Sequence, residues 1–342
     1  MGLGSTKQLD RSVIDRYTAE RLKATIEYAV ANSDFYGQLL GEALEKMKSA
    51  AGGQRAFMEA FKELPFTDAE DLRNQQTRLL CVGADKISRI VTLDTGGSTG
   101  VPKRIYFTEE DQQLTVDYFQ NGMQLIVDSS DKVLILMPAK APGSIGRLLG
   151  QGLRNLGNKV IEYGLPIGEP RHMQRLLELI SVEKVTSVVA LPTHMRMLAE
   201  ELAKGQGRHD DINIKSVLLS AEYIAGQDVE LIERVFDCKV YEHYGMTEMG
   251  LGCAVSCGHG DGYHIRELDL YIEIVDPETG RVIDGEEPGE IVFTTLTRKG
   301  MPFIRYRTGD YSRWIHERCR CGSVLRRIAK VGPREETKGY LK

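Results

Sequence analysis

The amino-acid sequence predicts an α/β fold, and three observations along its 342 residues indicate that class. Apolar residues at helical spacing come first, short apolar runs then alternate with amphipathic ones from residue 87, and closely spaced strands with tight turns follow residue 264. We therefore expect a helical N-terminal segment at 1–86, mostly parallel sheets flanked by helices at 87–263, an antiparallel, barrel-like subdomain at 264–330 and a short stub at 331–342.

The N-terminal segment is expected to be helical because its apolar residues recur every three or four positions. Val13 to Ala31 follows this spacing, and Phe57 to Phe61 repeats it. The stretch Leu64-Pro65-Phe66-Thr67-Asp68 ends one element. Thr67, with Glu70 three residues later, then predicts the N-cap and capping box of another helix.

The middle of the chain alternates between strands and helices, which is typical of a parallel sheet covered on both faces. Thr193 is the expected N-cap of one of the helices. The expected strands are 87–93, 104–107, 132–137, 159–163, 187–191, 216–219 and 239–242. The expected helices are 171–182, 194–204, 227–236 and one that ends near residue 157.

The last part of the chain favours antiparallel pairing because its strands follow one another at short intervals. Asp276-Pro277-Glu278-Thr279-Gly280 is a strong turn sequence between two of them. The expected strands are 270–275, 281–283, 290–295 and 303–306.

Composition and charge exclude several classes of protein. A net charge of −5 argues against a nucleic-acid-binding surface. No apolar run approaches the roughly 20 residues that a membrane-spanning helix needs, and the N-terminus lacks the pattern of a signal peptide. We therefore expect a cytoplasmic protein without nucleic-acid or membrane partners, whose six cysteines do not form a disulfide framework.

A loop rich in glycine and hydroxyl side chains lies between the strands expected at 87–93 and 104–107. Glycine lets a backbone approach a ligand closely, and successive N–H groups of such a loop can surround an anion. The spacing is not that of a Walker A loop. The loop therefore predicts a polyphosphate site, with a flexible turn as the alternative; the candidate residues are Thr95, Gly97, Ser98, Thr99, Gly100 and Lys103.

Two further motifs follow expected strands. Tyr244-Gly245-Met246-Thr247-Glu248 offers an aromatic ring, a hydroxyl and a carboxylate beyond a strand end, where α/β sheets bind ligands. Tyr306-Arg307-Thr308-Gly309-Asp310 ends in an aspartate that could accept two ribose hydroxyls. Taken singly, the first motif could be a turn followed by an acidic residue in the first turn of a helix. The second motif could be the end of an ordinary hairpin.

Together and in this order, the three motifs resemble the adenylate-forming superfamily, and most closely its phenylacetate–coenzyme A ligase branch. The resemblance covers about residues 10–335. Further stretches that support it are 64–67, 71–73, 220–222, 294–297 and 301–306. The fold it implies is the large N-terminal domain of these enzymes, with nucleotide- and substrate-binding subdomains at 87–263.

The resemblance implies an ATP-dependent carboxylic acid–CoA ligase that forms an acyl-adenylate before the thioester. It implies that the glycine-rich loop and Lys103 hold the β/γ-phosphates, that Thr247 contacts the α-phosphate and that Glu248 binds Mg²⁺. Adenine and ribose would then be bound by Tyr244, Gly245, the backbone at Ala221 and Glu222, and Asp310. Lys103, Thr247 and Glu248 are the expected catalytic residues.

The acid to be activated is expected to be a small carboxylic acid, with aromatic acids among the candidates. Its pocket walls are expected at 138–150, 190–194 and 242–244. His194 and His243 lie there, although a lone histidine is more often a hydrogen-bonded structural residue.

Two pairs of soft ligands predict a structural zinc site. Cys257 and His264 form one pair, and Cys319 and Cys321 form the other. The resembled branch carries a similar arrangement. Cys253 and His259 compete as ligands in the same loop, and unpaired thiols are the alternative to a metal.

The chain departs from the resembled family after residue 331. The family continues into a small mobile domain with a lysine needed for adenylation, whereas this sequence ends at Lys342 after a degenerate hinge at 332–336. We expect a fragment, a partner chain that supplies the small domain, or a non-catalytic nucleotide-binding subunit. An adenylyltransferase acting on a cofactor hydroxyl is the other alternative, and a homodimer stays open.

Overall fold

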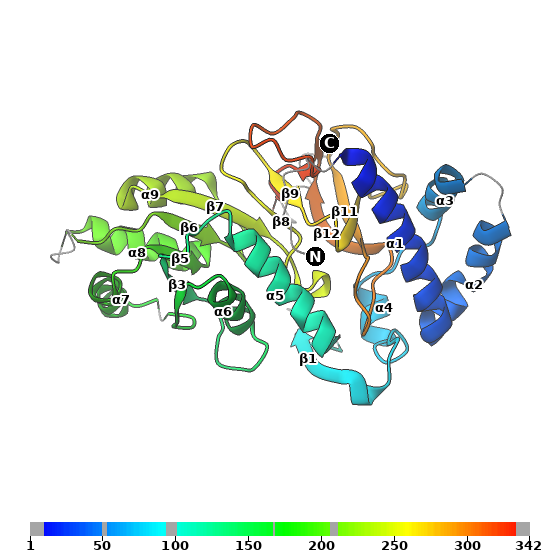
Figure 1. The fold of residues 1–342 in the computed structure, drawn as a ribbon, viewed down its shortest axis with the longest axis horizontal. Helices are drawn as coiled ribbons and strands as arrows, with labels where there is room; N and C mark the ends of the chain where they lie inside the picture. The colour runs from blue at the N-terminus through cyan, green and yellow to red at the C-terminus, as the bar shows by residue number, and fades with distance from the viewer. Residues whose placement is uncertain (1–9, 50–52, 94–100, 167, 206–210, 333–342) are drawn as a thin grey trace. The chain divides into compact units, whose positions relative to one another are not determined.

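The structure is a computed structural model that describes residues 10–49, 53–93, 101–166, 168–205 and 211–332 (Figure 1). The chain forms two compact units. Unit 1 combines residues 1–111 with residues 264–342, and unit 2 is the continuous segment 112–263. Unit 2 therefore interrupts the sequence of unit 1.

Unit 2 is built on parallel strands in the order β4-β3-β5-β6-β7. The strands are β3 (Lys132–Leu136), β4 (Lys159–Glu162), β5 (Ser187–Ala190), β6 (Ser216–Leu219) and β7 (Lys239–Tyr244), and β8 (Ala254–Val255) pairs antiparallel with β7. The helices are α5 (Glu109–Met123), which starts in unit 1, α6 (Ile145–Asn155), α7 (Pro170–Glu183), α8 (Pro192–Ala203) and α9 (Gly226–Phe236). This order is that of doubly wound sheets of the 2-1-3-4-5 type.

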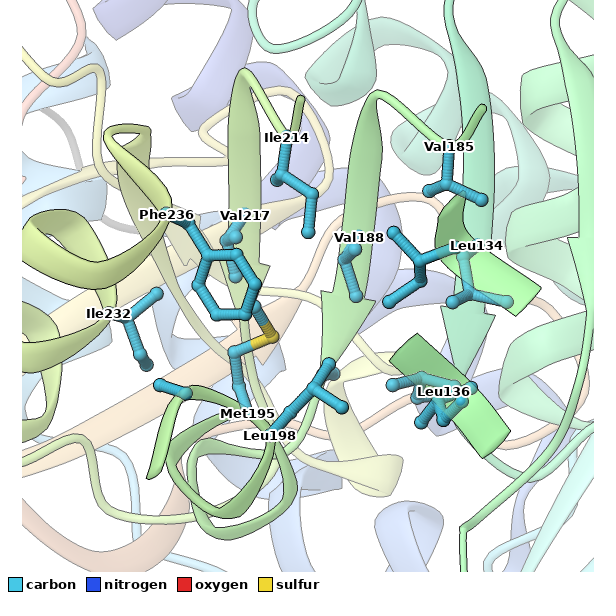
Figure 2. Packing of buried hydrophobic residues seen from close by; sticks show 14 of the residues in the cluster. Leu134, Leu136, Val185, Val188, Met195, Leu198, Ile214, Val217, Ile232 and Phe236 are labelled. Atoms are coloured by element: carbon cyan, nitrogen blue, oxygen red, sulfur yellow. The ribbon is translucent and has the colours of Figure 1, made fainter. Parts of the chain in front are cut away.

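Each face of this sheet buries its own apolar cluster. Successive side chains of a strand point to opposite faces, so Leu134 and Leu136 of β3 enter one cluster while Val133 and Ile135 enter the other. The first cluster packs against α7, α8 and α9 (Figure 2). The second packs against α5 and α6. Helices on both faces thus exclude water from the sheet, as a parallel sheet requires.

Unit 1 joins N-terminal helices to antiparallel strands. The helices are α1 (Arg11–Asn32), α2 (Asp34–Ser49), α3 (Gly53–Lys62) and α4 (Ala69–Asn74), followed by the 3₁₀ turn η1 (Ala84–Lys86). The strands are the pair β1 (Ile87–Leu93) and β2 (Lys103–Thr108), the three-stranded sheet β10 (Leu270–Val275), β11 (Gly289–Thr295) and β12 (Tyr306–Ser312), and the short β9 (Tyr263–Ile265), β13 (Trp314–Ile315) and β14 (Arg327–Ile328). Among the described residues, no helix combines the length and apolar character needed to cross a bilayer.

A buried arginine, paired with a glutamate, connects the two halves of unit 1. The side chains of Arg305 and Glu273 are 2% and 1% exposed, and Arg305 Nη2 lies 3.1 Å from Glu273 Oε1. The same guanidinium donates to the carbonyl oxygens of Lys62 and Leu64 and stacks over the Phe66 ring at 4.1 Å. Burial raises the pKa of Glu273 to about 7, although Arg305 acts in the opposite direction. Arg305 therefore fixes the segment after α3 to the β-sheet.

Most of the expected elements are confirmed. The strands expected at 87–93, 216–219 and 270–275 match β1, β6 and β10 to the residue, and the helix expected at 227–236 is α9. The α/β class with a helical N-terminal segment and a later antiparallel part is therefore the observed one.

Both expected helix caps are wrong. The N-cap of α4 is Asp68, whose carboxylate accepts hydrogen bonds from the backbone of Glu70 and Asp71. Thr67 instead donates its hydroxyl to the Ile304 carbonyl, 2.9 Å away. Thr193 lies inside α8, which begins at Pro192 with Leu191 as its N-cap, and the Thr193 hydroxyl donates to the Glu222 carboxylate.

Two expected strands are also wrong, and one helix is missing from the prediction. Segment 281–283 forms only an isolated bridge between Val282 and Val275. Segment 303–306 is not a strand, because β12 begins at Tyr306 and Arg305 has a φ of 48°, which lies far from extended backbone. Helix α5 was not predicted, although its acidic first turn favours a helix N-terminus.

Candidate functional site

The carboxyl ends of the parallel strands in unit 2 carry the sequence motifs predicted there. In a 2-1-3-4-5 sheet the strand order reverses between the first and third strands, here β3 and β5, and ligands bind outside the carboxyl ends near this point. Segment 220–222 follows β6, and Tyr244 ends β7. Since β6 and β7 pair in register from Ser216–Lys239 to Leu219–Glu242, these two segments leave the sheet side by side.

A buried serine and histidine link these two strand ends. Ser220 Oγ lies 2.7 Å from His243 Nδ1, and the two residues are 6% and 7% exposed. Two aromatic rings of α5 surround the imidazole, with ring centroids 5.8 Å away for Tyr118 and 6.5 Å away for Phe119. The hydrogen bond therefore orients an imidazole within an aromatic wall on the α5 face of the sheet.

The segment after β6 also reaches the start of α8. Ala221 has a φ of 72°, which is unusual for a residue with a side chain. The adjacent Glu222 carboxylate accepts hydrogen bonds from the Thr193 backbone N–H at 3.2 Å and hydroxyl at 2.7 Å. A carboxylate at a helix N-terminus is favoured by the helix dipole. Burial lowers the pKa of His194, while the charge of Glu222 acts to raise it.

The Tyr244–Glu248 motif forms the connection between β7 and β8. Tyr244 pairs with Ala254 across this hairpin, and the 3₁₀ turn η2 (Thr247–Met249) lies at its tip. Glu248 is only 1% exposed, whereas Tyr244 and Thr247 are half-buried.

Two glycines let the hairpin backbone pack tightly. A Cβ on Gly245 would lie 2.8 Å from the Gly252 Cα, and a Cβ on Gly252 would lie 1.9 Å from the Tyr118 ring. Thr115 of α5 also donates its hydroxyl to the Gly250 carbonyl at 3.0 Å. The hairpin is therefore held rigidly against α5, which sequence reasoning did not anticipate.

The other predicted nucleotide-binding residues belong to unit 1. Thr95, Gly97, Ser98, Thr99 and Gly100 lie outside the described residues. Lys103 is the first residue of β2 and pairs with Leu93.

Asp310 lies in β12, next to a register irregularity. Its N–H donates to the Thr308 hydroxyl at 3.0 Å. The preceding Gly309 has a φ of 72°, and its N–H donates to Glu290 at 2.9 Å. The backbone at Asp310 is thus fixed by neighbouring side chains.

Four soft ligands come together as predicted for a metal. The ligand atoms of Cys257, His264, Cys319 and Cys321 all lie within 4.8 Å of one another, and His264 Nε2 lies 3.4 Å from Cys321 Sγ. The thiols are free of disulfides. Burial lowers the pKa of His264 and so favours the neutral imidazole that can bind a metal. Among the described residues, the group contains neither Cys253 nor His259.

Sequence reasoning missed the contacts that hold these motifs. The aromatic wall of α5 and the serine–histidine and threonine–glutamate hydrogen bonds were not predicted. The sequence indicates these contacts only through the positions of Ser220 and Thr193, which both lie within three residues of the end of an expected strand.

Comparison with known proteins shows which family this chain matches. Residues 13–296 match the family model described as AMP-binding enzyme. The chain is 28% identical over 330 residues to a phenylacetate-coenzyme A ligase of Thermus thermophilus, covering 95% of this chain and 70% of that protein. It is 28% identical over 326 residues to the phenylacetate-coenzyme A ligase of Escherichia coli, covering 93% and 70%.

Solved structures share the fold. A crystal structure of 2-hydroxyisobutyryl-CoA ligase in complex with 2-HIB-AMP and CoA aligns with a TM-score of 0.82 and 22% identity. The alignment covers 96% of this chain and 69% of that one. At this identity the likeness concerns the fold.

Proposed function

We propose, from the premise that the chain belongs to the AMP-binding enzyme family, that it ligates a carboxylic acid to coenzyme A in an ATP-dependent reaction. The observation that carries this proposal is the match of nearly the whole chain to phenylacetate-coenzyme A ligases. In the first step a carboxylate oxygen attacks the α-phosphorus of ATP, and pyrophosphate leaves. In the second step the coenzyme A sulfur attacks the acyl carbon, AMP leaves and the thiol proton is released.

The residues of unit 2 would bind the nucleoside and α-phosphate. Tyr244 would stack on adenine beside the backbone of Ala221 and Glu222, and Thr247 would donate its hydroxyl to the α-phosphate. Such adenylyl transfer depends mainly on positioning and charge neutralisation. The support is local: segment 220–222 and Tyr244 leave neighbouring strands, and the tight hairpin backbone limits their motion.

The residues of unit 1 would bind the remaining parts of ATP. Lys103 and the loop at 95–100 would hold the β/γ-phosphates, and Asp310 would accept hydrogen bonds from the ribose hydroxyls. Glu248 of unit 2 would bind Mg²⁺, since this cation takes one or two carboxylates together with substrate phosphates. Magnesium would supply neutralisation of phosphate charge.

The acid is proposed to be small, with aromatic acids as the first to test. The support is the cluster of the Tyr118, Phe119 and His243 rings, in which His243 directly precedes Tyr244 in β7. An apolar ring packs well against such a wall.

Zinc is proposed as a structural metal. Three thiols and one imidazole within 4.8 Å fit tetrahedral Cys₃His zinc. A closed set of four ligands leaves no position for substrate, so Cys257, His264, Cys319 and Cys321 would stabilise the fold. Reduced thiols of this kind suit the cytoplasm, which we keep as the predicted location.

An exchange assay tests the proposal. ATP–pyrophosphate exchange is measured with purified protein across aryl and short-chain acids, and products are then identified by mass spectrometry with coenzyme A present. We expect acid-dependent exchange and the formation of AMP and a thioester. A stable adenylylated product without a thioester would instead identify an adenylyltransferase, and the absence of exchange with every acid would reject the proposed ligase.

A further inference from the structure

The hairpin that carries the predicted nucleotide motif leads directly to a predicted metal ligand. Strand β8 pairs with the end of β7 through His243–Val255 and Tyr244–Ala254. The ladder then continues by one residue. The Ser256 N–H donates to the Glu242 carbonyl at 2.8 Å, and the Glu242 N–H donates to the Ser256 hydroxyl at 2.8 Å. Cys257 is the next residue.

The segment that follows Cys257 contacts side chains of β7 at two places. Gly258 has a φ of 68°, and a Cβ there would lie 2.1 Å from Lys239 Cε and 3.3 Å from the Tyr241 ring. The Tyr263 hydroxyl donates to the Glu242 carboxylate at 2.7 Å, and this tyrosine is only 4% exposed. The segment is thus attached near both ends of β7.

Glu242 connects this segment to the nucleotide motif. Residues two apart on a strand point to the same face, so the Glu242 and Tyr244 side chains share one face of β7. Tyr263 binds the Glu242 side chain, and Ser256 binds the Glu242 backbone. A shift of the metal-binding segment would therefore move the strand end that carries Tyr244.

We propose that metal binding at Cys257 and ATP binding at Tyr244 are thermodynamically coupled through β7, with Tyr263 as the positioning residue that transmits the coupling. This inference rests on the proposed function, which supplies both ligands. Coupling between two sites is reciprocal. The metal raises the affinity for ATP, and ATP raises the affinity for the metal to the same extent. The predicted zinc site then has a role beyond stabilising the fold.

A binding cycle tests the coupling. ATP affinity is measured by calorimetry for the zinc-loaded protein and for the protein stripped with a chelator, with zinc content checked by elemental analysis. The variants are Tyr263→Phe, which removes only the donor to Glu242, and Tyr163→Phe as the matched control. Tyr163 makes a comparable hydrogen bond, 3.0 Å to His172 Nε2, but lies just beyond β4 at the far edge of the sheet.

The expected result is a loss of ATP affinity of about tenfold when the wild type is stripped, within the range of coupled sites. In Tyr263→Phe the ratio of stripped to loaded dissociation constants falls to about threefold or less, while Tyr163→Phe keeps the wild-type ratio. Equal ATP affinity of loaded and stripped wild type overturns the proposal. So does an unchanged ratio in Tyr263→Phe, or a purified protein that binds no zinc.

Circular dichroism reports whether the stripped protein stays folded. If the stripped protein unfolds, the comparison is made between the zinc-loaded variants alone. The coupling then requires zinc-loaded Tyr263→Phe to bind ATP several-fold more weakly than zinc-loaded Tyr163→Phe. Equal affinities reject the coupling. Failure of every form to bind ATP is a different result, since it rejects the proposed function itself.

Discussion

Replacing Arg305 with methionine should destabilise unit 1 in two distinguishable ways. One part of the lost stability does not depend on pH. The substitution removes the donors to the Lys62 and Leu64 carbonyls, each worth about 1.5 kcal/mol for a charged donor. It also removes the stacking over Phe66, worth about 0.5–1 kcal/mol. The expected loss in free energy of unfolding from these contacts is therefore about 3.5–4 kcal/mol.

The second part depends on the Glu273 carboxyl. Burial raises its pKa from 4.5 to about 7, so the folded state binds the proton more tightly than the unfolded state. Its contribution to stability is fully present below pH 4.5 and is lost as pH rises through about 7. Without Arg305 the pKa rises further, and the decline should continue above pH 7 at about 1.4 kcal/mol per pH unit.

Urea unfolding followed by circular dichroism at about pH 5.5, 7 and 8.5 measures both parts. The double variant Glu273→Met/Arg305→Met should lose the additional decline above pH 7, because no carboxyl remains to titrate. Arg313→Met is the matched control, since its ion pair with Glu286 is exposed and should contribute less than about 1 kcal/mol. A loss in Arg305→Met that is the same at all three pH values, or a double variant with the pH profile of the single one, would refute the reasoning.

Four further substitutions test the site. Asp310→Ala should weaken ATP binding by about tenfold, as expected for lost charged hydrogen bonds, and unchanged affinity in calorimetry contradicts the ribose role. Lys103→Ala should lower pyrophosphate exchange at least about tenfold, with an unaltered rate as the contrary result. Cys319→Ser should contain less zinc in elemental analysis and melt at a lower temperature; wild-type zinc content would show that Cys319 is not a ligand. Gly252→Ala should reduce stability by about 1–3 kcal/mol, because the new Cβ meets the Tyr118 ring; a wild-type urea midpoint argues against this close packing.

The inner strands could be predicted because their burial is visible in local composition. Strand β6 is Ser-Val-Leu-Leu and is buried at every position, and a short apolar run between turns is typical of a parallel strand covered on both faces. Helix α5 was missed, although its acidic first turn is a helix start signal and Val116, Phe119 and Met123 follow at the spacing of a core-facing helix side.

Arg305 illustrates what local composition cannot predict. Phenylalanine, isoleucine and tyrosine around it favour a strand, yet its backbone is left-handed and its guanidinium is buried. Both features depend on Glu273 and on carbonyl groups near residue 63, which are distant in sequence. No window of neighbouring residues contains that information.

Some features of the candidate site could likewise be predicted from the sequence, and others could not. The order of strands and motifs was enough to predict that segments 220–222 and 244–248 lie at strand ends, although β7 extends to Tyr244 and is longer than expected. The hydrogen bonds from Ser220 to His243 and from Thr193 to Glu222 depend on register and side-chain rotamers, which a single sequence does not specify. The roles assigned to Lys103, Thr247 and Asp310 stay predictions.

The interrupted sequence of unit 1 has a consequence for biosynthesis. Its first 111 residues leave the ribosome well before the strands at 264–332 that complete its core, whereas unit 2 is one uninterrupted stretch. Domains fold as units during translation, so the inserted unit can mature while its host is still half made. Nascent helices α1 to α4 meanwhile lack the later strands, such as β11, that α1 contacts in the folded unit. Chaperone engagement should therefore be strongest in this interval and end once β10 to β12 have emerged.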